Sequence, residues 1–151
     1  MHAFRGRLPA DFKFDRDEAN GGSFIDTNVL LYIASGDPEK AAKAEAIVAS
    51  GGMISMQVLN ELTHVARRKM QMSWTETHEF LDMLRSLLRV HPLSIETHER
   101  GLVLAERYGL SIYDAMIVGA AAQAGCDTLW SEDIYDSLLI EDRLRIRKPP
   151  I

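Results

Sequence analysis

The chain has 151 residues, a size that predicts one domain able to bury a single hydrophobic core. Its net charge of −5, with 46% hydrophobic and 26% charged residues, excludes a disordered chain and argues against a surface that coats nucleic acid. The chain has no apolar run of about 18 residues, no secretion signal and a lone cysteine, Cys126, so we expect a cytoplasmic protein.

The first segment, residues 1–22, is predicted to be an extension, because it mixes charges with little periodicity and ends in the turn signal Asn20-Gly21-Gly22. The sequence leaves open whether this extension is an arm that docks on a partner or an artefact of the start site. We expect the folded domain to occupy residues 23–151.

From residue 23 onward, strand-like and helix-like stretches alternate. The pattern predicts, in order, a strand at 23–27, a helix at 38–50, a strand at 53–55, helices at 56–70 and 73–89, a strand at 90–93, helices at 95–108 and 111–124, and a strand at 127–130. Residues 138–146 are expected to form a final edge strand or an irregular tail. This alternation indicates an α/β domain with a parallel sheet, in which ligands gather at the carboxyl ends of the strands.

Four acidic residues lie within stretches of largely apolar sequence that we expect to be buried, namely Asp26, Glu61, Asp114 and Asp133. A carboxylate in apolar surroundings is costly to bury unless a cation or hydrogen bonds compensate its charge. Four of them in one small domain indicate a shared cation, and clustered carboxylates suit the hard ions Mg²⁺ and Mn²⁺.

Each of the four residues also has a purely structural explanation. Asp26 could cap the helix that follows it, and Glu61 could be an ordinary exposed helix residue. Asp114 fits a capping box with Ser111, and Asp133 could be a turn residue. Taken singly, only Asp26 favours a functional role, so the joint pattern carries the hypothesis.

Four motifs in a fixed order make the pattern specific: Phe24-Ile25-Asp26-Thr27-Asn28-Val29-Leu30, then Asn60-Glu61-Leu62, then Tyr113-Asp114-Ala115-Met116-Ile117, then Leu129-Trp130-Ser131-Glu132-Asp133. From residue 23 to the C-terminus, this order resembles the PIN-domain nucleases, and in particular the VapC toxins of bacterial toxin–antitoxin pairs. The resemblance implies a three-layer PIN-like domain, with a central, mostly parallel twisted sheet flanked by helices.

The resemblance also implies a catalytic site. Asp26 and Asp114 would be the central metal ligands, and Glu61 and Asp133 would complete the acidic cluster directly or through water. The implied activity is an endoribonuclease dependent on Mg²⁺ or Mn²⁺ that hydrolyses RNA phosphodiester bonds and leaves a 5′-phosphate and a 3′-hydroxyl. The expected biological role is the toxin component of a toxin–antitoxin pair.

The residues around the fourth carboxylate leave its identity open. Asn28 and Ser131 match polar positions that orient the carboxylates in the family. Glu132 and Asp136 lie close to Asp133 in the sequence, and either one could replace or supplement it.

Basic and aromatic side chains give weaker predictions for RNA binding. Arg67, Arg68 and Lys69 follow the helix that carries Glu61, and they either steer RNA phosphates or complement the helix dipole. The same two interpretations hold for a second basic cluster, formed by Arg143, Arg145, Arg147 and Lys148. The aromatic candidates for base stacking are Trp74, Tyr113 and Trp130, of which Trp130 is favoured as a core residue.

The expected partners are an RNA substrate, a second copy of the chain and a cognate antitoxin with a basic side chain near Asp26 and Asp114. The apolar part of the antitoxin groove is expected around Leu81, Leu84 and Leu88, or around residues 47–48. Three alternatives stay open, namely a housekeeping PIN nuclease of RNA processing, a non-catalytic PIN-like binding module and a phosphatase of the aspartyl-phosphate type.

Overall fold

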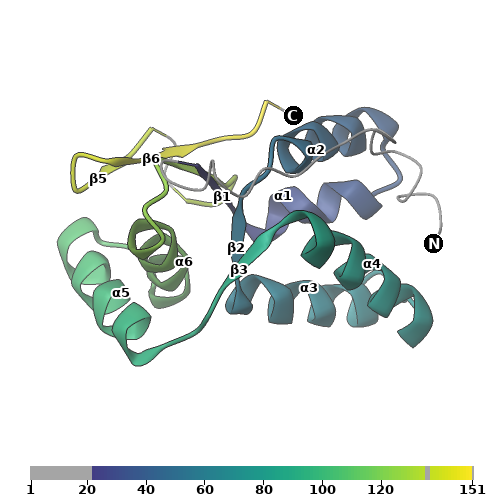
Figure 1. Ribbon diagram of the computed structural model, residues 1–151, viewed down its shortest axis with the longest axis horizontal. Helices are drawn as coiled ribbons and strands as arrows, with labels where there is room; N and C mark the ends of the chain where they lie inside the picture. The colour runs from purple at the N-terminus through teal and green to yellow at the C-terminus, as the bar shows by residue number, and fades with distance from the viewer. Residues whose placement is uncertain (1–21, 135–136, 151) are drawn as a thin grey trace.

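The computed structural model describes residues 22–134 and 137–150, in which one sheet is flanked by six α-helices (Figure 1). The strands are β1 (Ser23–Ile25), β2 (Met53–Ser55), β3 (Arg89–His91), β4 (Thr128–Trp130), β5 (Leu139–Ile140) and β6 (Leu144–Arg147). The helices are α1 (Thr27–Leu31), the 3₁₀ helix η3 (Tyr32–Ala34), α2 (Pro38–Ala49), α3 (Met56–Arg68), α4 (Trp74–Leu87), α5 (Ile95–Tyr108) and α6 (Ile112–Gln123).

The sheet has the strand order β3-β2-β1-β4-β6-β5, and among the described strands all neighbours are parallel except β5 and β6. In Figure 1, α5 and α6 lie on one side of the sheet and α1 to α4 on the other, which confirms the predicted three-layer α/β fold. The segments that follow β1, β2 and β4 leave the same edge of the sheet, because parallel strands all end there.

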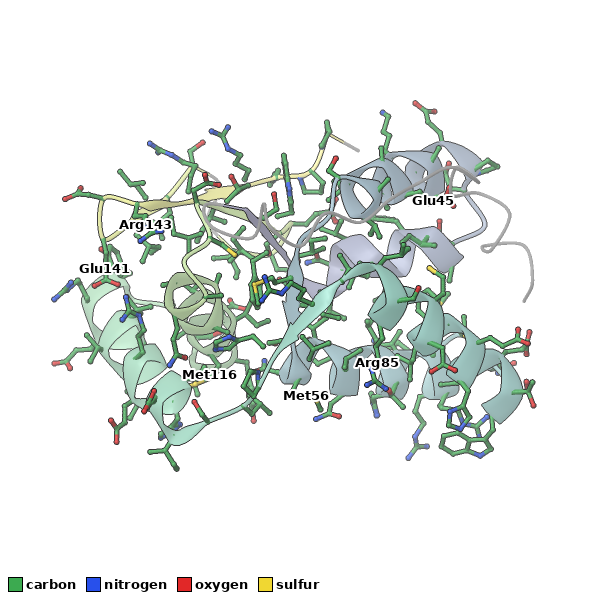
Figure 2. All side chains as sticks on the ribbon, in the orientation of Figure 1. Glu45, Met56, Arg85, Met116, Glu141 and Arg143 are labelled. Carbon is green, nitrogen blue, oxygen red and sulfur yellow. The ribbon has the colours of Figure 1, made fainter. Side chains whose placement is uncertain are left out.

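Helix α6 is held against α5 by a close approach of two glycines. A Cβ atom added at Gly119 would lie only 3.1 Å from the backbone nitrogen of Gly101. A Cβ added at Gly101 would lie 2.7 Å from the sulfur of Met116, which Figure 2 labels beside α6. A Cβ at Gly119 would press on the backbone of α5, so α6 needs glycine where the helices cross, whereas a Cβ at Gly101 would meet the flexible end of the Met116 side chain.

Two strand predictions need correction. The strand expected at 23–27 ends at Ile25, because Asp26 is the N-cap of α1 and Thr27 already begins that helix. The strand expected at 90–93 covers Arg89–His91, since the chain leaves the sheet before Pro92.

The expectation for residues 138–146 was only partly correct, because this segment forms a hairpin whose second strand, β6, lies inside the sheet between β4 and β5. Glu141 and Asp142 have positive φ angles of 51° and 57°, yet neither is the Gly or Asn that usually signals such a turn. Glu141 compensates by docking on α5, where its carboxylate lies 3.0 Å from Arg100 and its N–H donates to the hydroxyl of Tyr108 (Figure 2).

Most of the apolar residues expected to receive an antitoxin belong to the core. Leu84 and Leu88 are buried there, as are Ile47 and Val48, whereas Leu81 is partly buried against the core. The four buried side chains close the protein's own interior, so the prediction is wrong for them. No helix in the described part of the chain is long and apolar enough to cross a membrane.

Candidate functional site

The four predicted acidic residues meet at one pocket of about 200 Å³ at the carboxyl edge of the sheet. Asp26 follows β1, and Glu61 lies on α3, the helix that begins directly after β2. Asp114 lies in the first turn of α6, and Asp133 lies in the loop after β4. Four segments that are distant in sequence thus bring four carboxylates to one place.

Asp26 lines the pocket with only 4% of its surface exposed. One carboxylate oxygen accepts a hydrogen bond from the backbone N–H of Thr27 at 2.7 Å, and the other accepts one from the hydroxyl of Ser131 at 2.7 Å. Burial raises the pKa of Asp26 to about 6, and repulsion from Glu61 and Asp114 adds to this effect, while the two hydrogen bonds oppose it. The capping role and a functional role therefore coexist in one residue.

Glu61 is joined to Asp26 through Thr27, whose hydroxyl donates to the Glu61 carboxylate at 2.6 Å. The other oxygen of Glu61 accepts from the side-chain amide of Gln57 at 3.0 Å. The same amide reaches the backbone carbonyl of Tyr113 at 3.3 Å. Gln57 therefore ties the acidic position on α3 to the start of α6.

Asp114 fills the capping position that its spacing from Ser111 predicts, because its N–H donates to the Ser111 hydroxyl at 3.2 Å. Its carboxylate nevertheless lines the pocket. Burial raises the pKa of Asp114, and the negative charges of Asp133 and Glu61 raise it further. A cap alone would not place this carboxylate among three others.

Asp133 is exposed, and the side chain of Asn28 holds it by donating to its carboxylate at 2.8 Å. The amide oxygen of Asn28 accepts from the N–H of Glu132 at 3.5 Å, so one side chain of α1 holds two residues of this loop. The carboxylate of Glu132 accepts a hydrogen bond from the hydroxyl of Tyr32 and does not line the pocket. Glu132 thus anchors the loop, while Asp136 lies outside the described residues.

The described residues contain no group of three His, Cys, Asp or Glu side chains close enough to hold a metal ion as they stand. The donor set still fits a hard divalent cation, since Mg²⁺ keeps several of its waters and binds through one or two carboxylates. The mutual repulsion at Asp26 and Asp114 is the charge imbalance that a cation would relieve. The site therefore suits an ion bound partly through water.

Among the basic residues proposed for RNA binding, Arg67 has a structural role. Its guanidinium donates to the carbonyl of Met72 at 2.6 Å and lies 4.1 Å from the centre of the Trp74 ring. Arg68 and Lys69 are exposed at the end of α3, and neither lines the acidic pocket. RNA binding by these three residues stays a prediction.

Sequence reasoning missed three residues that hold the site together, namely Thr27, Gln57 and Tyr32. Thr27 stands beside Asp26 and Gln57 stands four residues before Glu61, where a helix brings side chains together. Both spacings could have indicated that these side chains contact the acidic residues. Tyr32 had none, because its partner Glu132 lies 100 residues away.

The sequence matches the model of the PIN domain family over residues 23–135, which is more than half of the chain. The chain therefore belongs to the PIN domain family. No curated protein matches it.

Several solved structures with similar folds are described as toxins or toxin–antitoxin complexes. A toxin–antitoxin complex from Klebsiella pneumoniae matches with a TM-score of 0.66 and 21% identity, over 85% of this chain and 98% of the other. VapBC2 from Rickettsia felis, bound to a promoter DNA fragment, matches with a TM-score of 0.61 and 21% identity, over 83% and 97%. VapC20 from Mycobacterium tuberculosis, a toxin that cleaves the sarcin–ricin loop, matches with a TM-score of 0.55 and 19% identity, over 74% and 90%. At these identities the likeness establishes a shared fold.

Proposed function

We propose that this PIN-domain protein is a metal-dependent endoribonuclease that hydrolyses RNA phosphodiester bonds at the pocket formed by Asp26, Glu61, Asp114 and Asp133. The observation that carries the proposal is the meeting of these four carboxylates at one edge of the sheet. A buried carboxylate with a pKa raised to about 6 lowers the stability of the fold when it is ionised. Its place in a cleft therefore favours a functional role over a stabilising one.

The cofactor would be Mg²⁺ or Mn²⁺, with Asp26 and Asp114 as the central ligands and Glu61 and Asp133 as direct or water-mediated ones. A bound divalent cation neutralises phosphate charge and makes water a better nucleophile at neutral pH. The donor set fits these ions because it consists of carboxylate oxygens, the ligands that hard cations prefer.

The chain's own residues orient the carboxylates. Ser131 and the N–H of Thr27 fix both oxygens of Asp26, so that this side chain has one orientation before the substrate arrives. Thr27 links Asp26 to Glu61, and Asn28 holds Asp133. Hydrogen bonds that hold a site in its working geometry reduce the reorganisation that the reaction requires.

The proposed reaction is hydrolysis by water and uses no side-chain nucleophile. Among the described residues that line the pocket there is no serine, cysteine or histidine. The hydroxyl of Thr27 is occupied as a donor to Glu61. A covalent intermediate on the protein is therefore not part of the proposal.

The decisive experiment is incubation of the purified protein with total RNA and either Mg²⁺ or Mn²⁺, with a chelator control and mapping of the cut ends. We expect cleavage that depends on the ion and leaves a 5′-phosphate and a 3′-hydroxyl. Asp114→Asn is the matched control, because it keeps the size and the backbone cap while removing the charge. Equal cleavage by wild type and Asp114→Asn would contradict the assignment.

We propose further that the nuclease is the toxin of a toxin–antitoxin pair. The similar folds of the Klebsiella and Rickettsia complexes support this role. An antitoxin would silence the acidic pocket with an Arg or Lys side chain, whose cation competes with the metal for the same carboxylates. Induced expression should arrest growth, and co-expression of an antitoxin encoded beside the gene should relieve the arrest. Normal growth on strong expression of active enzyme would favour a housekeeping role instead.

A further inference from the structure

The acidic pocket does not end at the four carboxylates. A second pocket of about 220 Å³, lined by Gly109, Leu110, Ser111, Asp114, Asp133 and Ile134, shares two residues with the first. Asp114 and Asp133 thus form the common wall of two adjoining hollows. The site is an extended groove with carboxylates in the middle, a shape that suits a chain crossing the reaction centre.

The groove is acidic, and basic side chains are absent from its described lining. Of the described residues that line the two pockets, none is a lysine or an arginine. Electrostatic attraction to the protein, which supplies most of the affinity in many nucleic-acid complexes, is therefore missing at this place. Binding must come from the cation and from contacts that carry no charge.

Tyr113 stands at the rim of this groove, with 74% of its surface exposed although it is an aromatic residue. It directly precedes Asp114, and Gln57 holds its backbone carbonyl at 3.3 Å while also holding Glu61. The backbone beneath the ring is therefore fixed relative to two of the carboxylates.

We propose that Tyr113 is a base-stacking residue that selects single-stranded RNA. One base beside the scissile phosphate lies on the Tyr113 ring, and the chain continues across Asp114 and Asp133 into the second pocket. Stacking holds a nucleotide by its uncharged face, so it works where four carboxylates repel phosphate. A base inside a duplex cannot reach the ring, because it is already stacked and paired. This inference rests on the proposed ribonuclease function.

The other strongly exposed aromatic residue of the described chain is a useful contrast. Trp74 is 59% exposed, but one face of its ring is covered by Arg67 and it lines neither pocket. Trp74→Leu therefore removes an exposed aromatic ring without touching the groove.

The test measures cleavage of a labelled single-stranded oligoribonucleotide, and of the same sequence closed into a hairpin, by the full chain with Mn²⁺. Tyr113→Leu keeps the bulk of the side chain and removes the aromatic ring, whereas Tyr113→Phe keeps the ring. We expect Tyr113→Leu to raise KM about tenfold, as the loss of one stacked base predicts, with kcat changed less than about twofold. Tyr113→Phe and Trp74→Leu should stay within about twofold of wild type in both constants.

A second readout reports stacking itself. An oligonucleotide with 2-aminopurine next to the cleavage site is bound to protein carrying Asp114→Asn, which keeps the substrate intact. The fluorescence should fall when the base stacks on Tyr113, and should not fall when Tyr113→Leu is added. A residue that only stabilises the fold would leave this signal unchanged.

The outcomes separate the two proposals. If wild type fails to cut any RNA, the ribonuclease function is overturned, and the stacking role with it. If wild type cuts RNA but Tyr113→Leu has the wild-type KM, or hairpin and single strand are cut equally, only the stacking role is overturned. A dimer that dissociates on Tyr113→Leu while KM stays unchanged would assign the ring to a protein contact, which also overturns it.

Discussion

Asp26 and Asp133, which we call the buried wall and the loop wall of the same pocket, are held in contrasting ways. Asp26 leaves the central strand of the sheet, is 4% exposed, and has both oxygens fixed by Thr27 and Ser131. Asp133 lies in a loop, is exposed, and is held by the side chain of Asn28. The buried wall is part of the core, whereas the loop wall lies at the surface and is held there by a side chain.

This difference separates two ways of placing a carboxylate. The buried wall is accurate but electrostatically costly, because burial and neighbouring charges raise the pKa of Asp26 to about 6. The loop wall avoids that cost through solvent exposure. Its orientation depends on Asn28 of α1 and on Tyr32 of η3, which donates a hydrogen bond to Glu132. Substitution of the buried carboxylate should therefore lower activity most, whereas substitutions at the loop should mainly change the position of Asp133.

The largest effect is expected at the buried wall and its neighbour on α6. Asp26→Asn and Asp114→Asn should each lower kcat/KM for RNA by about a thousandfold or more, because each removes a charge that holds the cation. Circular dichroism should show that both variants stay folded. Wild-type rates in either purified variant would contradict the assignment of that residue.

Stability should move in the opposite direction at Asp26. Its pKa is raised to about 6 from 3.8, so the folded protein without metal binds the proton more tightly than the unfolded chain does. The stability from this group is complete below about pH 4 and is lost as the pH rises through about 6. Asp26→Asn cannot ionise and should raise the free energy of unfolding at pH 7, in chelator, by up to about 3 kcal/mol.

Urea unfolding at pH 5 and pH 7 measures this effect, with Asp133→Asn as the exposed control, for which a change below about 0.5 kcal/mol is expected. A loss of stability in Asp26→Asn at pH 7 would show that its hydrogen bonds to Thr27 and Ser131 outweigh the burial of charge.

A smaller loss of activity is expected at the loop wall. Asp133→Asn should reduce kcat/KM about 10- to 100-fold, since an exposed ligand that binds partly through water contributes less than a buried one. Glu132→Gln should cost less than Asp133→Asn, because the Glu132 carboxylate faces Tyr32 and not the pocket. Equal losses in the two variants would mean that Glu132 shares the ligand role.

The smallest effect tests the attachment of the loop. The hydrogen bond to Glu132 and burial raise the pKa of Tyr32 to about 12, so its hydroxyl remains a donor across the working pH range. Tyr32→Phe should cost about 1 kcal/mol in stability and lower kcat by about two- to fivefold. Tyr108→Phe is the matched control, because it removes a hydroxyl that binds Glu141, away from the pocket. An effect of Tyr108→Phe on kcat as large as that of Tyr32→Phe would contradict a specific role for the loop.

The sequence predicted the α/β class because the alternation of strand-like and helix-like stretches is local. Asp26 can be read as a candidate from the apolar strand before it, but a capping serine three residues before Asp114 favours a structural role. The other three acidic positions were therefore predicted only from the order of all four motifs along the chain. The β5–β6 hairpin was not predictable in detail, since Glu141 and Asp142 adopt positive φ without glycine and the turn is held by contacts of Glu141 with α5. The burial of Leu84 and Leu88 likewise depends on packing that helical spacing alone does not reveal. The extension at residues 1–22, homodimerisation and the metal remain predictions.

Binding of Mn²⁺ tests the central claim most directly, because it needs neither a substrate nor a partner. Titration calorimetry of the purified protein should show saturable binding, and the ion should raise the melting temperature by mass action on the folded state. Both signals should disappear in an Asp26→Asn, Asp114→Asn double variant that melts as one cooperative unit. Equal Mn²⁺ binding by wild type and the double variant, or no binding by either, would contradict a cation site built from these carboxylates.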